Sequence, residues 1–522
     1  MVRRLFLAAL ASASFVVPAA AQTMPSGRVV LVLPFENRSG NPSLNWIGDS
    51  FPDTLDRRLN SVGFLTISQD DRRFALDHLG LPTDFRPSRA TTIRIAQQLD
   101  CNYVVIGSFN VVNGHIRIQS QVLAVSEFKL SAPVEDAAEL NRLYDAENAI
   151  AWKVARSIDP KLNIAEQTFL ATAGAVPLSA FEDYIRGTNT ANPTERLTRL
   201  TEAVKIVPDY SSALLALGKE QYAAKDYPAA SATLAKVPQD SPLALEAGFY
   251  LGLSRFNANN YAAAAAAFDF VGSRLPLPEV LNNHGVALAR QGKDGIEYFL
   301  KASKSDPNDS DFHYNLAVSL YRRGETTEAF KEANAALKLK PTDGDIATLR
   351  SRLAAAAPGS KLNPNDTTFA PAERIRRTYS EASFRQAAFQ LDQIRDARLA
   401  MLPPAKRAAE YNNIGHDYMT QGLLPQAEEQ FNSAIEADSS NADAHAGLAE
   451  VREKSGQKAE ARTEAQNSLR LKPNVAAYLV LARLDLADKN VPAAVEDVNH
   501  ATTLDPHNPQ AIALRMSLQQ HQ

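Results

Sequence analysis

The stretch "NLAVSLYRRGETTEAFKEANAALKLKP", residues 315–341, decides the fold. It has the pattern of two amphipathic helices joined by a short turn. Its smallest residues occupy places where a helix usually carries a bulky side chain: Ala317, Gly324, Ala329, Ala333 and Ala336. Small side chains let two helix backbones approach closely. The stretch therefore predicts a helical hairpin whose alanines are packing contacts, and a leucine at one of them should overpack the contact.

The same spacing of small residues recurs along the chain. Copies begin at Ala408, at Ala442 and near Val475, and earlier ones surround Leu251 and Gly285. This pattern resembles the tetratricopeptide repeat, a helix–turn–helix unit of about 34 residues. The resemblance extends over about two thirds of the chain and implies about eight or nine units.

The repeats divide into two predicted arrays. The first array covers residues 177–357, and a loop rich in proline and polar residues follows at 358–372. The second array covers residues 373–507, and its first unit is a poor copy of the pattern. Residues 508–522 are predicted to form the polar helix that closes a solenoid.

A different pattern precedes the helices. "RVVLVLPF" (28–35) is a continuous apolar run, typical of a strand buried on both faces. In "NYVVIGSFNVVNGHIRIQSQVLAV" (102–125), Asn113-Gly114 separates two β-rich runs and predicts a hairpin. We therefore expect a small α/β domain over residues 28–135 and connecting helices over 136–176. The predicted fold class is α+β, with this domain in front of an all-α solenoid.

Three segments of the α/β region resemble the amino-terminal domain of the periplasmic protein TolB and its relatives. They are "VVLVLPFEN" (29–37), "LDRRLNSVGFLTIS" (55–68) and the hairpin above. The β-propeller that follows this domain in TolB is absent. The resemblance therefore implies the domain alone, as in bacterial relatives that join it to helical repeats.

The amino terminus predicts export. "MVRRLFLAALASASFVVPAAAQ" has two arginines, an apolar core and small residues before Gln22, as in a secretory signal peptide cleaved after Ala21. Gln22 also replaces the cysteine that a lipid anchor at this site would need. No later segment has the apolar length of a membrane span. We expect a soluble periplasmic protein, or alternatively a fully secreted one.

No catalytic motif is present. We find no phosphate-binding G-x-x-x-x-G-K-[ST], no G-x-S-x-G and no H-E-x-x-H. No cofactor or metal is predicted. His313 and His445 occupy packing positions of their repeats, and Cys101, the single cysteine, is expected to be a buried small residue. The net charge of −4 and the interleaved charges argue against binding nucleic acid.

The concave groove of the arrays is the remaining candidate surface. Its lining is predicted at fixed positions of each first helix: Asn282, Arg290, Tyr314, Tyr321, Arg322, Asn412, His416 and Met419. Asn283, Asn315 and Asn413 share a further position where such repeats often have asparagine. Arg290 and Arg322 lie at matching places, which suggests a groove that prefers an acidic segment.

These observations favour an exported, non-enzymatic scaffold or assembly factor. Its groove would bind peptide segments or helices of envelope proteins. A second hypothesis is a regulatory or sensory protein whose α/β domain binds a small ligand that the repeats relay. A third is an enzyme of unrecognised type, which paired titratable residues in a closed cleft would favour.

Overall fold

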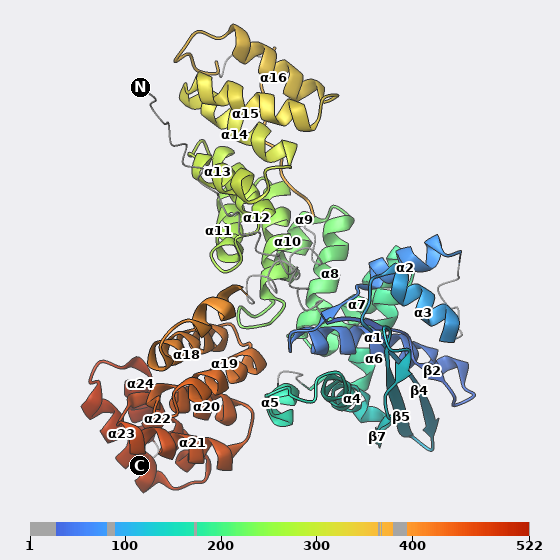
Figure 1. Cartoon of the computed structure of the whole chain (residues 1–522), viewed down its shortest axis with the longest axis vertical. Coiled ribbons are helices and arrows are strands. Elements are labelled where there is room, and N and C mark those ends of the chain that lie inside the picture. The colour runs from blue at the N-terminus through green and yellow to red at the C-terminus, as the bar shows by residue number, and fades with distance from the viewer. Residues whose placement is uncertain are drawn as a thin grey trace, which may run out of the picture.

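The structure is a computed structural model that describes residues 28–80, 89–171, 175–363, 366, 368–378 and 394–520. An α/β unit with a mixed sheet is followed by a long run of helices, which confirms the predicted fold class (Figure 1). The predicted signal peptide (1–21), residues 379–393 of the predicted second array and the last two residues of the predicted capping helix lie outside the described residues.

The described part of the α/β unit contains one sheet with the strand order β3-β1-β4-β5-β6. β1 pairs in parallel with β3 and β4, whereas β4 and β5 form an antiparallel hairpin. Short β2 pairs with β4, and β7 pairs with β5. The strands are β1 (Val29–Val32), β2 (Glu36–Asn37), β3 (Leu65–Thr66), β4 (Tyr103–Val112), β5 (His115–Ala124), β6 (Lys129–Leu130) and β7 (Val134–Glu139).

The predicted hairpin is confirmed. Asn113 and Gly114 have φ angles of 51° and 76°, and Val112 pairs directly with His115. Two positive φ angles are what a two-residue hairpin turn requires, and Asn-Gly adopts them at little cost. In β5, Ile116 and Ile118 are buried whereas His115 is exposed, as the alternating sequence predicts.

Both faces of the sheet are covered by helices. Val30 and Val32 pack on the side of α1 (Asn45–Asn60) and α4 (Leu143–Ile158). Leu31 and Leu33 pack on the other side, toward α2 (Gln69–His78) and α3 (Arg89–Gln98). This double burial is the reason why "VVLVL" is apolar without alternation.

The boundary of the α/β unit lies further along the chain than the sequence suggested. Residues 136–139, predicted as connecting helix, belong to β7, and α4 packs on the sheet. The sequence of β7, "VEDAAE", favours helix by composition. Its backbone nevertheless pairs along the edge of β5, and this pairing outweighs intrinsic propensity.

A buried carboxyl group lies between α1 and α4. Glu147 is fully buried and accepts a hydrogen bond from the Ser50 hydroxyl, and its other carboxyl oxygen has no hydrogen-bond partner among the described residues. Burial raises the pKa of Glu147 from its ordinary value of 4.5 to about 8. The folded chain therefore keeps this group protonated at neutral pH.

This burial makes stability depend on pH. Between pH 4.5 and 8 the folded state binds a proton that the unfolded state has released, so the free energy of unfolding falls as pH rises. The contribution of Glu147 is at most about 1.4 kcal/mol per pH unit. Glu147→Gln should remove this slope and leave the chain more stable than wild type at pH 8. Urea unfolding of both chains at pH 5 to 8 measures the difference, and parallel pH profiles would contradict it.

The helical part continues directly from the α/β unit. Phe181, Ile185 and Tyr210 belong to the same apolar core as α1 and α4. The helices before the interruption are α5 (Glu166–Ala171), α6 (Leu178–Asn189), α7 (Pro193–Ile206), α8 (Ser211–Ala223), α9 (Tyr227–Leu234), α10 (Ala244–Asn257), α11 (Tyr261–Gly272), α12 (Pro278–Ala289), α13 (Ile296–Ser305), α14 (Ser310–Arg323), α15 (Thr326–Leu339) and α16 (Gly344–Ala355). Those after it are α18 (Pro404–Thr420), α19 (Leu424–Ala437), α20 (Ala442–Lys454), α21 (Lys458–Leu471), α22 (Val475–Ala487), α23 (Val491–Leu504) and α24 (Pro509–Gln520).

The small residues of the opening stretch are packing contacts, as predicted. Ala317, Ala329, Ala333 and Ala336 are all fully buried between helices. Gly324 ends α14 with a φ of 93°, a left-handed conformation that favours glycine. The opening stretch therefore forms the helical hairpin α14–α15 that its sequence predicts.

The second array packs back onto the region after α4. α5 contacts α19 and α20, and the Gln457 amide donates to the Thr168 hydroxyl over 3.0 Å. The Ala165 amide donates to the buried carboxylate of Glu428 over 3.1 Å, and Glu428 also pairs with Arg452. Figure 1 shows α19 and α20 facing α5.

Candidate functional site

Residues 369–378, called the strap below, lie along the concave face of the first array. The chain leaves α16, turns back and descends past α12 in Figure 1. The strap has no helix or strand, although the sequence assigned residues from 373 onward to the second array. The structure differs there because groove side chains bind residues 373–376 individually.

Asparagine side chains bind the strap backbone. The Asn315 side chain donates to the Arg374 carbonyl over 2.8 Å and accepts from the Arg374 amide over 2.7 Å. Asn283 makes the same pair of hydrogen bonds to the carbonyl and amide of Arg376, each 2.7 Å long. Asn282 adds a second donor to the Arg374 carbonyl, over 2.9 Å. These three asparagines thus bind an extended backbone through contacts that do not depend on its side chains.

The positions of these asparagines explain why the bound strap residues, Arg374 and Arg376, are two residues apart. Asn283 and Asn315 occupy the same place in successive first helices, α12 and α14, and both are fully buried. Residues two apart in an extended chain point the same way and are separated by about 6.5–7 Å. One asparagine per repeat can therefore meet every second residue. The strap runs opposite to the order of the repeats.

An acidic side chain of the strap is buried between two arginines. The carboxylate of Glu373 has no exposed surface, lies 3.1 Å from Arg290 and also pairs with Arg322. Ser319 donates to it over 3.4 Å. Arg290 reaches the Glu373 carbonyl over 3.1 Å, and Arg322 the Pro371 carbonyl over 3.0 Å. The two arginines therefore bind both charge and backbone.

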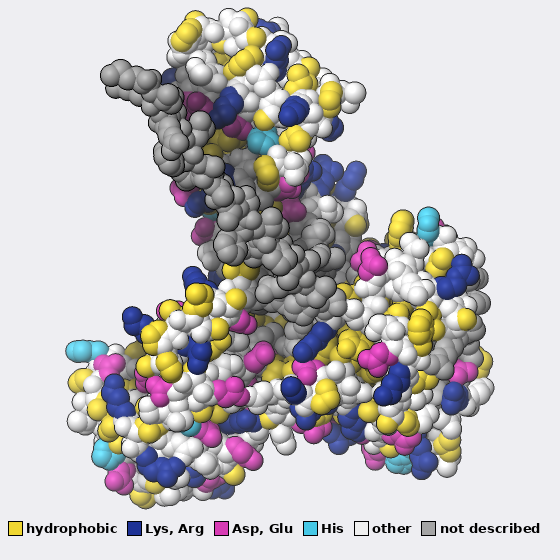
Figure 2. Space-filling view, viewed as in Figure 1, with side chains coloured by type: hydrophobic (Ala, Val, Ile, Leu, Met, Phe, Trp, Pro, Cys, Tyr) yellow, Lys and Arg dark blue, Asp and Glu magenta, His cyan; other side chains and the backbone are white. Residues whose placement is uncertain are grey.

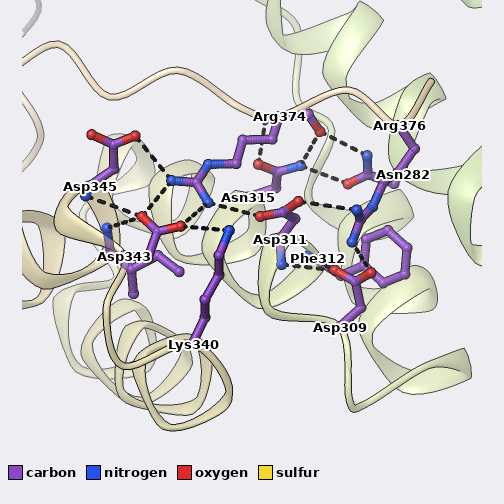
Figure 3. A network of polar contacts seen from close by, with 11 residues as sticks. Asn282, Asp309, Asp311, Phe312, Asn315, Lys340, Asp343, Asp345, Arg374 and Arg376 are labelled. Carbon is purple, nitrogen blue, oxygen red and sulfur yellow. Dashed lines mark hydrogen bonds and ion pairs between the residues drawn. The ribbon is translucent and has the colours of Figure 1, made fainter.

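The next side chain, Arg374, enters an acidic subsite (Figure 3). Its guanidinium binds both oxygens of Asp343 over 2.8 and 2.9 Å, Asp311 over 2.8 Å and Asp345 over 3.0 Å. It also stacks on the Tyr314 ring, 4.3 Å from the ring centre. The Arg374 guanidinium holds the pKa of Asp343 well below its usual range. A planar fork with several donors fits this arrangement better than a lysine would.

Arg376 occupies a second acidic subsite. It pairs with Asp309, lies 3.3 Å from Asp311, and its guanidinium is 5.3 Å from the centre of the Phe312 ring. Its Nε atom has no acceptor among the described residues, so this subsite satisfies an arginine less completely. Between the two arginines, Ile375 packs against the apolar clusters on both sides of α12.

The aspartates of these subsites have a structural role as well. Asp309 accepts hydrogen bonds from the first amides of α14, and Asp343 does the same for α16. Such caps satisfy amides that lack partners within the helix. The same carboxylates also bind the strap arginines, so each aspartate both caps a helix and binds the strap.

The predicted groove residues of the first array gather here, but those of the second do not. Asn282, Arg290, Tyr314 and Arg322 all contact the strap. Tyr321 contacts the preceding linker, because its carbonyl accepts from the Leu362 amide over 3.2 Å. The second-array candidates lie on α18: Asn412, His416 and Met419.

The α18 candidates are partly buried within their own repeat. The His416 ring packs edge-on against Phe431, with ring centres 5.1 Å apart. Met419 packs on the same apolar cluster. Asn413, at the place equivalent to Asn283, is exposed.

Nothing in the described residues adds a chemical centre to this groove. Burial raises the pKa of the Cys101 thiol to about 12, so it is protonated and unreactive, as its predicted packing role implies. His313 and His445 each lie 2.6 Å from a glutamate of the partner helix in their repeat. Among the described residues, no three metal-binding side chains cluster.

Sequence reasoning missed the strap and three of the acids that bind its arginines, Asp309, Asp343 and Asp345. Glu373, Arg374 and Arg376 read as the start of a weak repeat. A usable signal was present in Pro371 and in Arg374-Ile375-Arg376, where charged and apolar residues alternate as in an extended chain.

A family model described as "Tetratricopeptide repeat" matches residues 196–271, 282–344 and 412–476. These stretches match the repeat pattern and fold into the paired helices that it predicts. The second match contains α14 and the part of α12 from Asn282 onward, which includes the strap-binding residues of both helices. Proteins built from this repeat are typically non-enzymatic scaffolds that bind other proteins or peptides on extended concave surfaces.

Similar solved structures cover parts of the chain. The C-terminal domain of LpoB from Escherichia coli is 27% identical, covers 22% of this chain and 83% of its own, and has a TM-score of 0.20. MamA is 19% identical, with coverage of 30% and 94% and a TM-score of 0.29. YrrB, titled "a TPR protein with an unusual peptide-binding site", is 15% identical, with coverage of 40% and 98% and a TM-score of 0.28.

A search of curated proteins finds no match to the chain. The resemblance of residues 28–135 to the TolB domain is not confirmed by any of these comparisons and stays a prediction. In the part of the chain that the structure describes, no helix combines the length and apolar character needed to cross a bilayer.

Proposed function

We propose that this chain is an exported, non-enzymatic scaffold that binds extended segments of other proteins in its concave grooves. One observation carries the proposal: the first groove binds an extended backbone through Asn283 and Asn315. These asparagine contacts do not depend on the side chains of the bound segment. The same surface can therefore serve a segment of another protein.

Localisation and partner class are part of the proposal. The amino-terminal 21 residues have the features of a signal peptide, which supports a periplasmic or secreted protein. Envelope proteins are then the accessible partners. Positive and negative side chains are interspersed over the face seen in Figure 2, which suits specific contacts better than binding to a polyanion.

Photo-crosslinking tests this function. A photoreactive residue is placed at Tyr321 in the first groove or at Asn413 on α18, and in a control chain at exposed Leu471 on α21. With envelope extract, we expect the groove positions to crosslink to specific proteins and unlabelled chain to compete. Equal labelling from Leu471, or none from the groove, would contradict the proposal.

The sensory alternative has one observation in its favour. A cavity of about 160 Å³ lies beside α1 and is lined by Asp49, Asp53, Arg57 and Arg72, among others. Asp53 already pairs with Arg57, 2.7 Å away, and Arg72 donates to the Val32 carbonyl. Ligand sites usually exceed about 300 Å³. The groove therefore supports the scaffold function better.

A further inference from the structure

Residues 373–376 of the strap are bound on top of the solenoid core, as a ligand is bound, whereas Phe369 at the start of the strap is buried in an apolar cluster of the first array. Beneath it, Val286, Phe299 and Ala317 are packed between helices and are fully buried. Over residues 373–376 the strap adds hydrogen bonds, ion pairs and the partly buried Ile375 on top of that core. The groove can therefore persist when the strap leaves.

The strap also reports what the groove recognises. Four successive subsites accept an acidic side chain, a basic one, an apolar one and a basic one, filled by Glu373, Arg374, Ile375 and Arg376. The first two are the most selective. Glu373 is fully enclosed by arginines, and Arg374 meets three aspartates.

We propose that the strap is an internal ligand and that the external partner is an extended peptide with the same acidic–basic–apolar–basic order, which competes with it. This inference rests on the proposed function. It adds the chemistry of the partner and a regulation, because the groove becomes available only when the strap is displaced.

Tethering sets the expected strength of this regulation. A segment on a short linker experiences an effective concentration of about 1 mM. If the same sequence binds as a free peptide with a Kd of about 10–30 μM, the strap weakens an external peptide by about thirty- to hundredfold. Partners must therefore be abundant, multivalent or better matched than the strap.

The probe is a fluorescent peptide with the strap sequence, FAPAERIRRT, and anisotropy measures its binding to the full mature chain. In a released chain, Glu373→Lys with Arg374→Glu reverses the charges that hold the strap. We expect the released chain to bind the probe at least about thirtyfold more tightly than wild type. Adding Asn315→Ala to it should weaken binding at least about tenfold, since both backbone bonds are lost.

A matched control peptide, FAPAKEIRRT, carries the two selective charges exchanged. We expect it to bind the released chain at least about tenfold more weakly than the probe. Equal binding of both peptides would overturn the proposed recognition pattern. A folded released chain that binds the probe no better than wild type would overturn the competition.

A second measurement needs no variant. Excess unlabelled FAPAERIRRT should speed amide hydrogen exchange in the strap of the wild-type chain, because displaced residues lose their partners. Unchanged exchange at millimolar peptide would also overturn the competition. If groove positions crosslink to envelope proteins but neither peptide experiment gives its expected result, the scaffold function stands and the competition fails. If the peptide binds but no crosslinks form, the proposed envelope partner fails and the four subsites remain.

Discussion

Glu373→Lys is expected to expel the strap from the first groove. The wild-type carboxylate is fully buried against Arg290 and Arg322, so the variant places three positive charges together. Losing one partner of a buried ion pair typically costs about 3–5 kcal/mol. Because both arginines are partly exposed, we expect the variant to weaken binding of the strap to the groove by about 2–3 kcal/mol. This loss raises the strap-free population by about 30- to 150-fold.

An arginine-specific protease measures this release. Cleavage after Arg374 and Arg376 requires the strap to leave the groove, so the rate should rise by the same factor as the open population. Glu297→Lys is the matched control, because Glu297 is exposed and pairs with Lys301 on the surface of its own helix. Equal cleavage rates in wild type and Glu373→Lys would contradict the assigned contacts.

Phe431→Ala is expected to lower the free energy of unfolding of the second array by about 3–5 kcal/mol. Phe431 is fully buried on α19 and lies between two glycines of successive first helices. A methyl group at Gly415 would come within 2.6 Å of its ring, and one at Gly447 closer still. Removing the ring leaves a cavity at the contact between two repeats, which the closely packed backbones cannot fill.

Urea unfolding followed by circular dichroism measures this loss. The transition of the second array should shift to lower urea, whereas Leu471→Ala, at a side chain that is 44% exposed, should shift it by less than about 0.5 kcal/mol. Similar losses from the two substitutions would show that the ring does not join the repeats.

The regular parts of this fold could be predicted because their packing repeats. Ala329 and Gly415 occupy equivalent seams far apart in the sequence, and each has a local reason to be small. Asn113-Gly114 specifies its turn by backbone conformation alone. Such local requirements determine the residue type at each position, so they can be recognised in the sequence.

The strap could not be predicted in the same way. Glu373 is buried only because Arg290 and Arg322, 83 and 51 residues away in the chain, come together around it. Arg290 and Arg322 were identified as a pair that would favour an acidic segment, but nothing local indicated that the acid belongs to this chain. β7 was missed for a related reason, since its pairing with β5 is a tertiary contact.

Amide hydrogen exchange at Arg374 and Arg376 in the full mature chain tests the central claim most directly. Both amides donate to asparagine side chains over 2.7 Å, so we expect them to exchange at least about a hundredfold more slowly than in the free peptide FAPAERIRRT. The double variant Asn283→Ala/Asn315→Ala should remove the protection. Exchange at the rate of the free peptide in the wild-type chain would show that the groove does not bind the strap.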